Sequence, residues 1–146
     1  IIEVLDPIWK EVGDQWNQVL PTKEDFKELY NICEHSEFVT NVCSSTIFDF
    51  VAHKKPCIYY NYEQPQLRKG IRDIGQNYKY VHFRSMPTQE AVVFCHNKKD
   101  LEGIVKNILE GEISNVKDGL EWFEIIAGEN SENASNQIWS QIDKLV

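Results

Sequence analysis

The chain has 146 residues and a formal net charge of −8, with 42% hydrophobic and 26% charged residues. A chain of this length and composition can bury a continuous hydrophobic core, so we expect one globular domain over residues 1–146. The acidic balance repels phosphate backbones, which argues against a nucleic-acid partner. No run of about 18 apolar residues could cross a bilayer, which argues against a transmembrane segment.

The start of the chain and its cysteines bear on its origin. The first residue is Ile1, and the single methionine, Met86, lies deep inside. We interpret the sequence as a domain excised from a longer protein, with a further domain outside these residues. The cysteines form no C-x-x-C pair and lie in apolar surroundings, which favours reduced thiols, a cytoplasmic compartment and neither disulfide nor zinc. They are Cys33, Cys43, Cys57 and Cys95.

The first third of the chain carries one strong helix signal. Residues 1–5 are apolar enough for a short strand, whereas the apolar residues of 9–19 recur at intervals that are ambiguous. Thr22 followed by Asp25 is typical of a helix start, and apolar residues then recur on one helical face up to residues 35–36. We therefore predict a short strand and then a helix.

The next stretch, residues 37–62, predicts a strand-helix-strand unit. Residues 37–43 form a short apolar run that suits a strand covered on both faces. Residues 47–54 leave little polar surface, as expected of a helix packed against a sheet. Pro56 stops that helix, and residues 57–60 predict the following strand.

A loop and two β-type stretches follow. Polar and charged residues with proline and glycine over residues 63–77 are typical of a surface loop that carries function. β-branched and aromatic residues at 80–83 and 91–95 predict two strands on either side of a turn at 86–88.

Three helices are predicted in the last third of the chain, because apolar residues recur there at helical spacing. They cover residues 100–111, 120–128 and 131–145, with Ser131 as the cap of the last one. Alternation of strands and helices favours a mostly parallel sheet. We therefore predict an α/β fold, a Rossmann-like mostly parallel sheet with helices on both faces.

The candidate binding site lies between the first two strands of this unit. Ser44, Ser45 and Thr46 stand at the carboxyl end of a buried strand and the amino end of a helix. In open α/β sheets this junction faces the ligand crevice, and free amides of a first helical turn stabilise phosphate. The alternative is a purely local cap, with Thr46 followed by Asp49.

Charged residues near this unit could assist binding. Glu63 follows the second strand, where its carboxylate could accept hydrogen bonds from a ribose or polyol; a solvated loop glutamate is the alternative. Lysines and arginines gather around the same unit, although most such side chains are only solvated. They are Lys54, Lys55, Arg68, Lys69 and Arg72.

No motif in the chain indicates a metal or a resident cofactor. The four histidines share no metal-ligand spacing, and His35 and His53 fall at the ends of predicted helices. Neither the phosphate-binding loop of ATPases, nor the glycine fingerprint of dehydrogenases, nor a serine elbow is present. We therefore expect no metal and no cofactor, and the catalytic residues stay unknown.

Residues 44–50, Ser-Ser-Thr-Ile-Phe-Asp-Phe, and residues 55–60, Lys-Pro-Cys-Ile-Tyr-Tyr, resemble the carboxy-terminal half of GT-B-fold transferases. The pattern is most similar to that of the CDP-glycerol glycerophosphotransferases of teichoic acid and capsule synthesis. Residues 67–73 look like the Arg-Gly-containing loop that follows in that family. The resemblance is loose over residues 22–146, and Thr40-Asn41-Val42-Cys43 departs from the family's Thr-Asp-Tyr, so a sugar-nucleotide donor is as plausible as CDP-glycerol.

The resemblance implies a donor-binding half of a transferase. Ser44, Ser45 and Thr46 would meet the donor phosphates. The nucleotide or polyol part of the donor, CDP-glycerol or a nucleotide sugar, would meet a second set of residues, namely Asn41, Glu63, Arg68 and Lys69. The acceptor-binding domain would belong to the missing part of the same protein.

We therefore predict a fragment, inactive alone, of an enzyme that moves a glycosyl or glycerol-phosphate group to a cell-envelope polysaccharide. It would be cytoplasmic or held at the inner face of the membrane through the parent protein. The alternative is a non-catalytic Rossmann-like interaction module that uses Trp9, Trp16 or Trp122 as partner anchors.

Overall fold

The computed structural model describes residues 2–15, 17–63, 74–128 and 130–145. Its contacts divide the chain into two units, Ile1–Ser36 and Glu37–Val146, and each is described by itself. Within the described residues, no helix is both long enough and apolar enough to span a membrane.

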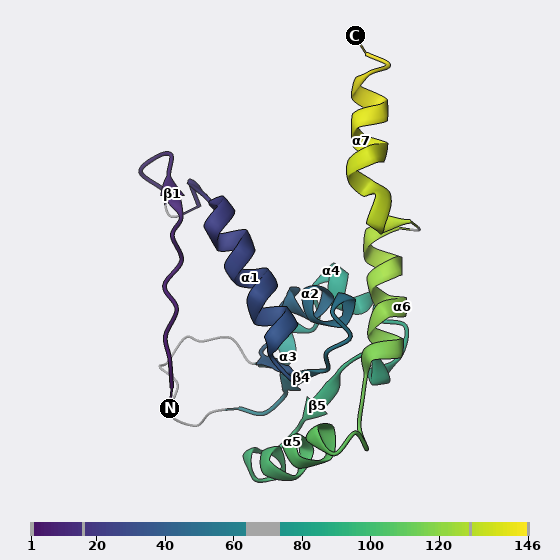
Figure 1. Cartoon of the computed structure of the whole chain (residues 1–146). Helices are drawn as coiled ribbons and strands as arrows, with labels where there is room; N and C mark the ends of the chain where they lie inside the picture. Colours follow the sequence, from purple (N-terminus) through teal and green to yellow (C-terminus); the bar gives the residue numbers. More distant parts are fainter. Residues whose placement is uncertain (1, 16, 64–73, 129, 146) are drawn as a thin grey trace. The chain divides into compact units, whose positions relative to one another are not determined.

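The first unit consists of a small hairpin and one helix (Figure 1). Strand β1, Lys10–Glu11, pairs antiparallel with β2, Val19–Leu20. The ambiguous stretch 9–19 thus forms a hairpin. The strand expected at residues 1–5 is wrong for the described residues 2–5, because no strand in the described chain supplies it with ladder hydrogen bonds.

Helix α1, Lys23–His35, confirms the helix predicted from its start signal. The Asp25 amide donates to Thr22 Oγ1 over 3.2 Å, and the Thr22 amide donates to Asp25 Oδ2 over 2.6 Å. This reciprocal pair satisfies two amides that a helix start leaves free. The hydrogen bond from the Thr22 hydroxyl is the main reason why the pKa of Asp25 is lowered.

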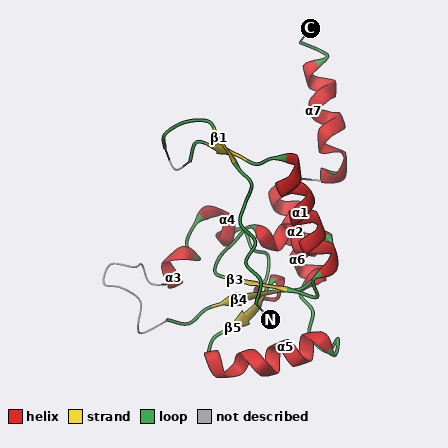
Figure 2. Ribbon diagram, turned by 60° about the vertical axis from the view of Figure 1, so that its left-hand side comes forward, coloured by secondary structure: helices red, strands yellow, loops and turns green. Residues whose placement is uncertain are grey.

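The second unit is built on a three-stranded parallel sheet in the order β3-β4-β5 (Figure 2). The strands are β3, Val39–Asn41, β4, Cys57–Tyr60, and β5, Val93–Cys95. They confirm the strands predicted within 37–43, at 57–60 and within 91–95. The central strand β4 is buried over its first three residues, which explains its continuous apolar run.

Helices cover both faces of this sheet, and the alternating side chains of β4 show how. Cys57 and Tyr59 join a core with Trp122 of α6, Val116–Ala127, and with residues of α2, Thr46–Ala52. Ile58 points the other way, into a core with α5, Leu101–Leu109. Figure 2 shows α5 on one side of the strands and α2 with α6 on the other. The predicted α/β fold with a parallel sheet between helices is confirmed at this level.

Several short turns of helix and a terminal helix complete the described part of the second unit. The structure contradicts the strand predicted at 80–83, because α4 occupies that position and only Phe83 of its four residues is buried, as on one side of a helical turn. The predicted loop 63–77 ends in helix α3, and its residues 64–73 lie outside the described ones. The short elements are α3, Ile74–Asn77, α4, Val81–Arg84, and the 3-10 turns η1, Gln89–Ala91, and η2, Lys98–Asp100.

The late helices are confirmed, but not all of their ends: α6 begins at Val116 rather than at residue 120, and the last helix ends at Ile142 rather than at residue 145. Asp100 precedes α5, and Gly111 and Gly128 take positive φ angles of 76° and 84° after α5 and α6, where glycine is the favoured residue. Helix α7, Ala134–Ile142, is preceded by the 3-10 turn η3, Ser131–Asn133. The expected Ser131 cap is therefore wrong, because Ser131 starts that extra turn and Asn133 takes the cap position.

A buried asparagine links the start of β4 to the turn η1 by hydrogen bonds. Asn115 is 2% exposed, its Oδ1 accepts from the Cys57 amide over 2.9 Å, and its Nδ2 donates to the Ala91 carbonyl over 2.7 Å. Close packing of α6 on α2 accompanies it, since a Cβ on Gly119 would lie 2.7 Å from Val51 Cγ1. These contacts fix the start of β4 relative to the turn η1.

Candidate functional site

The turn between β3 and α2 is closed by its own hydrogen bonds. The Ser44 amide donates to Asn41 Oδ1 over 3.2 Å, and the Thr46 amide donates to Ser44 Oγ over 3.2 Å. The hydroxyls of Ser44 and Thr46 share a further hydrogen bond of 2.7 Å. Cys43 has a φ of 50°, a conformation that a residue with a side chain adopts at a cost. The polar groups of this turn are therefore mostly paired within the turn.

These contacts bear on both readings of the serine pair. Ser45 is the cap residue of α2 and makes no side-chain capping bond, so the cap expected from Thr46 and Asp49 does not form. Ser45 is exposed, and among the described residues we find no hydrogen-bond partner for its amide or hydroxyl. A phosphate at this turn would compete with the bonds of Ser44 and Thr46. The phosphate site stays a prediction, with Ser45 as its most accessible member.

An aromatic cluster lies directly behind the turn. The Tyr59 hydroxyl donates to the Ser44 carbonyl over 2.6 Å, and the Tyr78 hydroxyl donates to the Tyr60 carbonyl over 2.9 Å. The Tyr78 hydroxyl also bonds to the Cys43 side chain. Ring centroids of Tyr78 and Phe94 are 5.5 Å apart at an edge-on angle of 72°. Tyr78 thus connects the turn after β3 to the ends of β4 and β5.

Burial controls the protonation of this cluster. Desolvation is the main cause that raises the pKa of Tyr59, Tyr78 and Cys43, and it raises the pKa of Cys57 to about 12. All four groups are therefore neutral at physiological pH. They offer hydrogen bonds and apolar surface, and none of them is an activated nucleophile.

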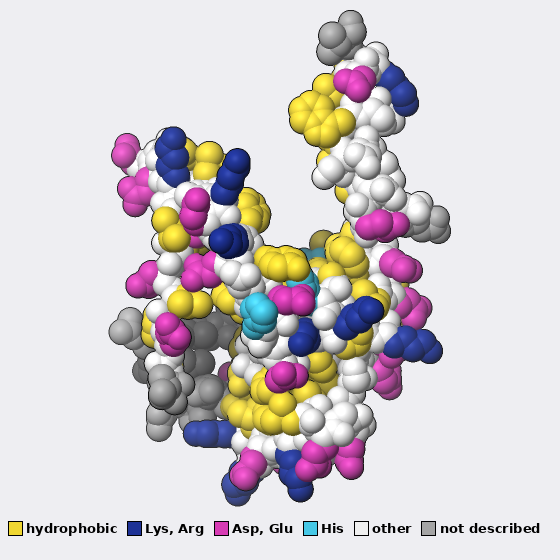
Figure 3. Space-filling model, in the orientation of Figure 1, with side chains coloured by type: hydrophobic (Ala, Val, Ile, Leu, Met, Phe, Trp, Pro, Cys, Tyr) yellow, Lys and Arg dark blue, Asp and Glu magenta, His cyan; other side chains and the backbone are white. Residues whose placement is uncertain are grey.

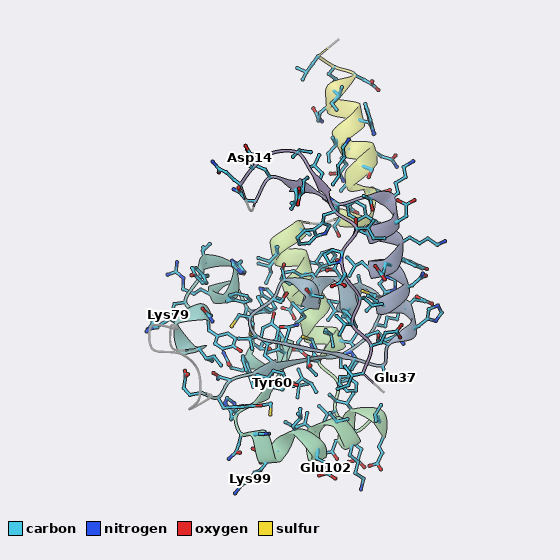
Figure 4. All side chains as sticks on the ribbon, turned by 90° about the vertical axis from the view of Figure 1, so that its left-hand side faces the viewer. Asp14, Glu37, Tyr60, Lys79, Lys99 and Glu102 are labelled. Atoms are coloured by element: carbon cyan, nitrogen blue, oxygen red, sulfur yellow. The ribbon has the colours of Figure 1, made fainter. Side chains whose placement is uncertain are left out.

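A cavity of about 260 Å³ opens at the carboxyl edge of the sheet. Asn61 follows β4 and Phe94 lies in β5, so the ends of two neighbouring parallel strands border it. Figure 4 labels Tyr60, the last residue of β4, and Lys79, which follows α3. The lining consists of aromatic rings, one thioether, two side-chain amides and one glycine, namely Asn61, Gly75, Tyr78, Phe83, Met86, Gln89 and Phe94.

Two side-chain amides contribute to the lining of this cavity, which exposes more polar than apolar surface. Asn61 Nδ2 lies 3.4 Å from His96 Nδ1, and the Asn61 backbone amide donates to the Cys95 carbonyl over 2.8 Å. Gln89 is exposed on η1. Small-molecule sites are typically mostly apolar with a few placed polar groups, so this cavity is more polar than most. The cavity can hold a planar ring and offer amide hydrogen bonds to its edge.

The other predicted site residues lie in different positions. Asn41 is half-buried and donates from Nδ2 to Cys57 Sγ over 3.6 Å, so it supports the turn. Glu63 accepts a bond of 2.7 Å from the Ile74 amide, which is a local link, and it does not line the cavity. Arg68 and Lys69 lie outside the described residues. Their roles toward a donor stay predictions.

The tryptophans proposed as partner anchors differ in how far they are buried. Trp122 is fully buried and its Nε1 donates to Ser85 Oγ over 3.0 Å, so its expected role as a partner anchor is wrong. Trp16 lies outside the described residues. Trp9 is 53% exposed and lines an apolar groove of about 390 Å³ in the first unit, together with Phe26 and Leu29.

The remaining titratable side chains form no second centre. His35 lies in the last turn of α1 and His53 caps the end of α2, as expected from the sequence. In the described ranges, no three side chains of histidine, cysteine, aspartate or glutamate come together as metal ligands would. None of the four cysteines forms a disulfide.

The structure thus shows an α/β unit with a small cavity at the carboxyl edge of a parallel sheet. Comparison of the chain with family models, with curated proteins and with solved structures found no match.

Proposed function

We propose that the unit Glu37–Val146 binds the nucleotide of an activated donor at the carboxyl edge of its parallel sheet. The cavity beside Asn61 and Gln89 receives the base, and the exposed Ser45 lies on the side of the donor phosphates. In the parent protein this unit would present a glycosyl or glycerol-phosphate group for transfer to a cell-envelope polysaccharide. The choice of a transferase rests on the resemblance of residues 38–73, and the cavity is the observation that carries the binding site.

The size and lining of the cavity support a base rather than a whole nucleotide. A volume of about 260 Å³ is smaller than that of most drug-sized ligand sites, so the sugar and phosphates would remain outside. Tyr78, Phe83 and Phe94 supply aromatic surface, and stacking of a base on such rings stabilises binding by about 1–3 kcal/mol. Carboxyl edges of parallel sheets are the usual ligand sites of open α/β folds.

Thermal unfolding with added nucleotide tests this proposal. A ligand at about ten times its Kd stabilises the folded protein by about 1.4 kcal/mol. We expect CDP, UDP or GDP to raise Tm by roughly 4–8 °C under that condition. Inorganic diphosphate at the same concentration should give a smaller shift, because it lacks the base. No shift with any of the three nucleotides at millimolar concentration would contradict the proposal.

A pair of neighbouring substitutions locates the binding. Gln89→Ala removes an amide that lines the cavity, whereas Glu90→Ala changes the next residue of the same exposed turn, which does not line it. Both variants should unfold at nearly the same temperature without ligand, since exposed substitutions seldom change stability by more than about 0.5 kcal/mol. The nucleotide shift should shrink only in Gln89→Ala.

The exposed groove of the first unit favours a second candidate function, that of an interaction module without catalysis. Trp9 is half exposed there among apolar neighbours, which is typical of a partner anchor. This candidate predicts no nucleotide effect on Tm. It also predicts that Trp9→Ala removes binding to a protein partner.

A further inference from the structure

Helix α7 carries an apolar stripe that no described residue of its own unit, Glu37–Val146, covers. Every residue of Ala134–Ile142 is exposed, and Ile138, Trp139 and Leu145 are 60%, 63% and 87% exposed. Figure 3 shows hydrophobic side chains on the surface of this helix. Ser135, Ile138, Ile142 and Leu145 are spaced by three, four and three residues. This is the spacing of a seam between two paired helices.

The charges at the two ends of α7 restrict what can cover the stripe. Within residues 131–145 the only charged side chains are Glu132 at the start and Asp143 and Lys144 at the end. The polar side of the helix consists of uncharged serine, asparagine and glutamine, so it offers nothing to a strongly acidic or basic partner. A second copy of the same helix meets no like-charge barrier along its length.

The order of those charges also sets the direction of pairing. In an antiparallel pair, Glu132 of one copy lies near Lys144 of the other, and the symmetry repeats this contact at the opposite end. A parallel pair would place Glu132 beside Glu132 and Lys144 beside Lys144. The antiparallel pair also aligns the positive end of each helix dipole with Asp143 of the other copy.

We propose that two copies of this chain associate through α7 as an antiparallel helix pair, with Ile138, Ile142 and Leu145 of each copy in the seam. Such an interface is self-complementary about a twofold axis. A few apolar side chains on a short helix cover less than the roughly 800 Å² per partner of a typical stable interface. The association is therefore weak and depends on concentration. It is independent of the nucleotide site.

Sedimentation equilibrium of the full chain, from about 10 µM to about 1 mM, measures this association. The chain should shift from monomer to dimer across that range. Ile138→Gln combined with Ile142→Gln should weaken the apparent Kd by at least about 100-fold, because four apolar side chains leave the seam. The control variant, Asn136→Gln with Ser140→Gln, installs the same residue on the opposite side of α7 and should dimerise normally.

Charge exchange tests the direction of pairing. Glu132→Lys alone brings two lysines together at each end of the pair, and Lys144→Glu alone brings two glutamates together. Each should weaken dimerisation by roughly three- to tenfold at low salt. Mixing the two variants should restore dimerisation. In the mixed pair, each end contact joins a lysine of one variant to a glutamate of the other.

Two results would overturn the proposal. The first is a chain that stays monomeric at the highest concentration. The second is a dimer that remains intact when Ile138→Gln and Ile142→Gln are combined. In addition, failure of the mixed charge variants to dimerise would rule out the antiparallel arrangement. Far-UV circular dichroism of each variant checks that α7 remains helical.

Discussion

The two halves of the sheet edge differ in a way that matters for function. After β3, the turn at Ser44 and Thr46 uses its amides and hydroxyls for its own hydrogen bonds. After β4 and β5, the edge is hollow and lined by aromatic rings and two amides. The sequence motif points to the first place and the geometry to the second. A serine-rich helix start is thus a weaker guide to a site than the shape of the edge beside it.

The largest expected effect is a loss of stability in the core that packs against the cavity. Trp122 is fully buried, and its ring centroid lies 6.1 Å from that of Phe83, which lines the cavity. Trp122→Ala should lower the free energy of unfolding by about 3–5 kcal/mol, because it removes a large buried ring and leaves a void. Urea unfolding measures this loss.

The matched control for that variant is Trp139→Ala on α7, where the same side chain is 63% exposed. It should cost less than about 1 kcal/mol. Equal losses for the two variants would mean that the burial of Trp122 does not stabilise the core as described.

A smaller loss is expected from the hydrogen bonds that hold β4 to η1. Asn115→Ala leaves the Cys57 amide and the Ala91 carbonyl unpaired in the core. Each unpaired buried group costs about 1–3 kcal/mol, so we expect a total loss of about 2–6 kcal/mol in the free energy of unfolding. Asn115→Asp keeps the acceptor and should lose less at low pH, where the carboxyl is protonated and can also donate. A loss below about 0.5 kcal/mol in Asn115→Ala would contradict this account.

The sequence predicted those parts of the fold that local chemistry determines. Thr22 and Asp25 specify the start of α1, and the apolar run at Cys57–Tyr60 after Pro56 specifies β4. The stretch at 80–83 was misassigned because four aromatic and β-branched residues fit either a strand or one helical turn, and only tertiary packing of Phe83 decides between them.

The cavity could not be predicted in the same way. Asn61, Tyr78 and Gln89 lie far apart in the chain and meet only through the parallel pairing of β4 with β5 and the placement of η1. Asn115 likewise gives no local signal, because both of its partners are more than 20 residues away. One local signal does mark the cavity: Asn61 directly follows a buried strand, which is where open α/β sheets carry ligand contacts.

Substitution of the serine pair sharpens the comparison between turn and cavity. Ser44→Ala removes the acceptor of the Thr46 amide and should cost about 0.5–1.5 kcal/mol. Ser45→Ala removes no described hydrogen bond and should leave Tm unchanged. If the donor phosphates meet this turn, Ser45→Ala will weaken diphosphate binding without a loss of stability, as isothermal titration can measure. Unchanged binding in Ser45→Ala would confine the site to the cavity.

The smallest effect concerns the thiol of Cys43, which lies in the turn after β3 next to Tyr78 of the cavity. Burial raises the pKa of Cys43, so the thiolate that reacts with iodoacetamide is scarcer at any given pH than in the unfolded chain. Alkylation of Cys43, followed by mass spectrometry, should therefore reach half its maximal rate at a higher pH in the folded protein than in urea. A midpoint at the same or a lower pH would show that the Cys43 thiol is not desolvated as described.

The central claim is that the hollow edge, and not the closed turn, receives the base of a nucleotide. Amide NMR spectra of the labelled chain, recorded during titration with CDP, UDP and GDP, test it directly. We predict that the best of the three shifts the side-chain amides of Asn61 and Gln89 and the backbone amide of Tyr78 most strongly. Shifts confined to residues 44–46, or no shifts at millimolar nucleotide, would contradict the claim.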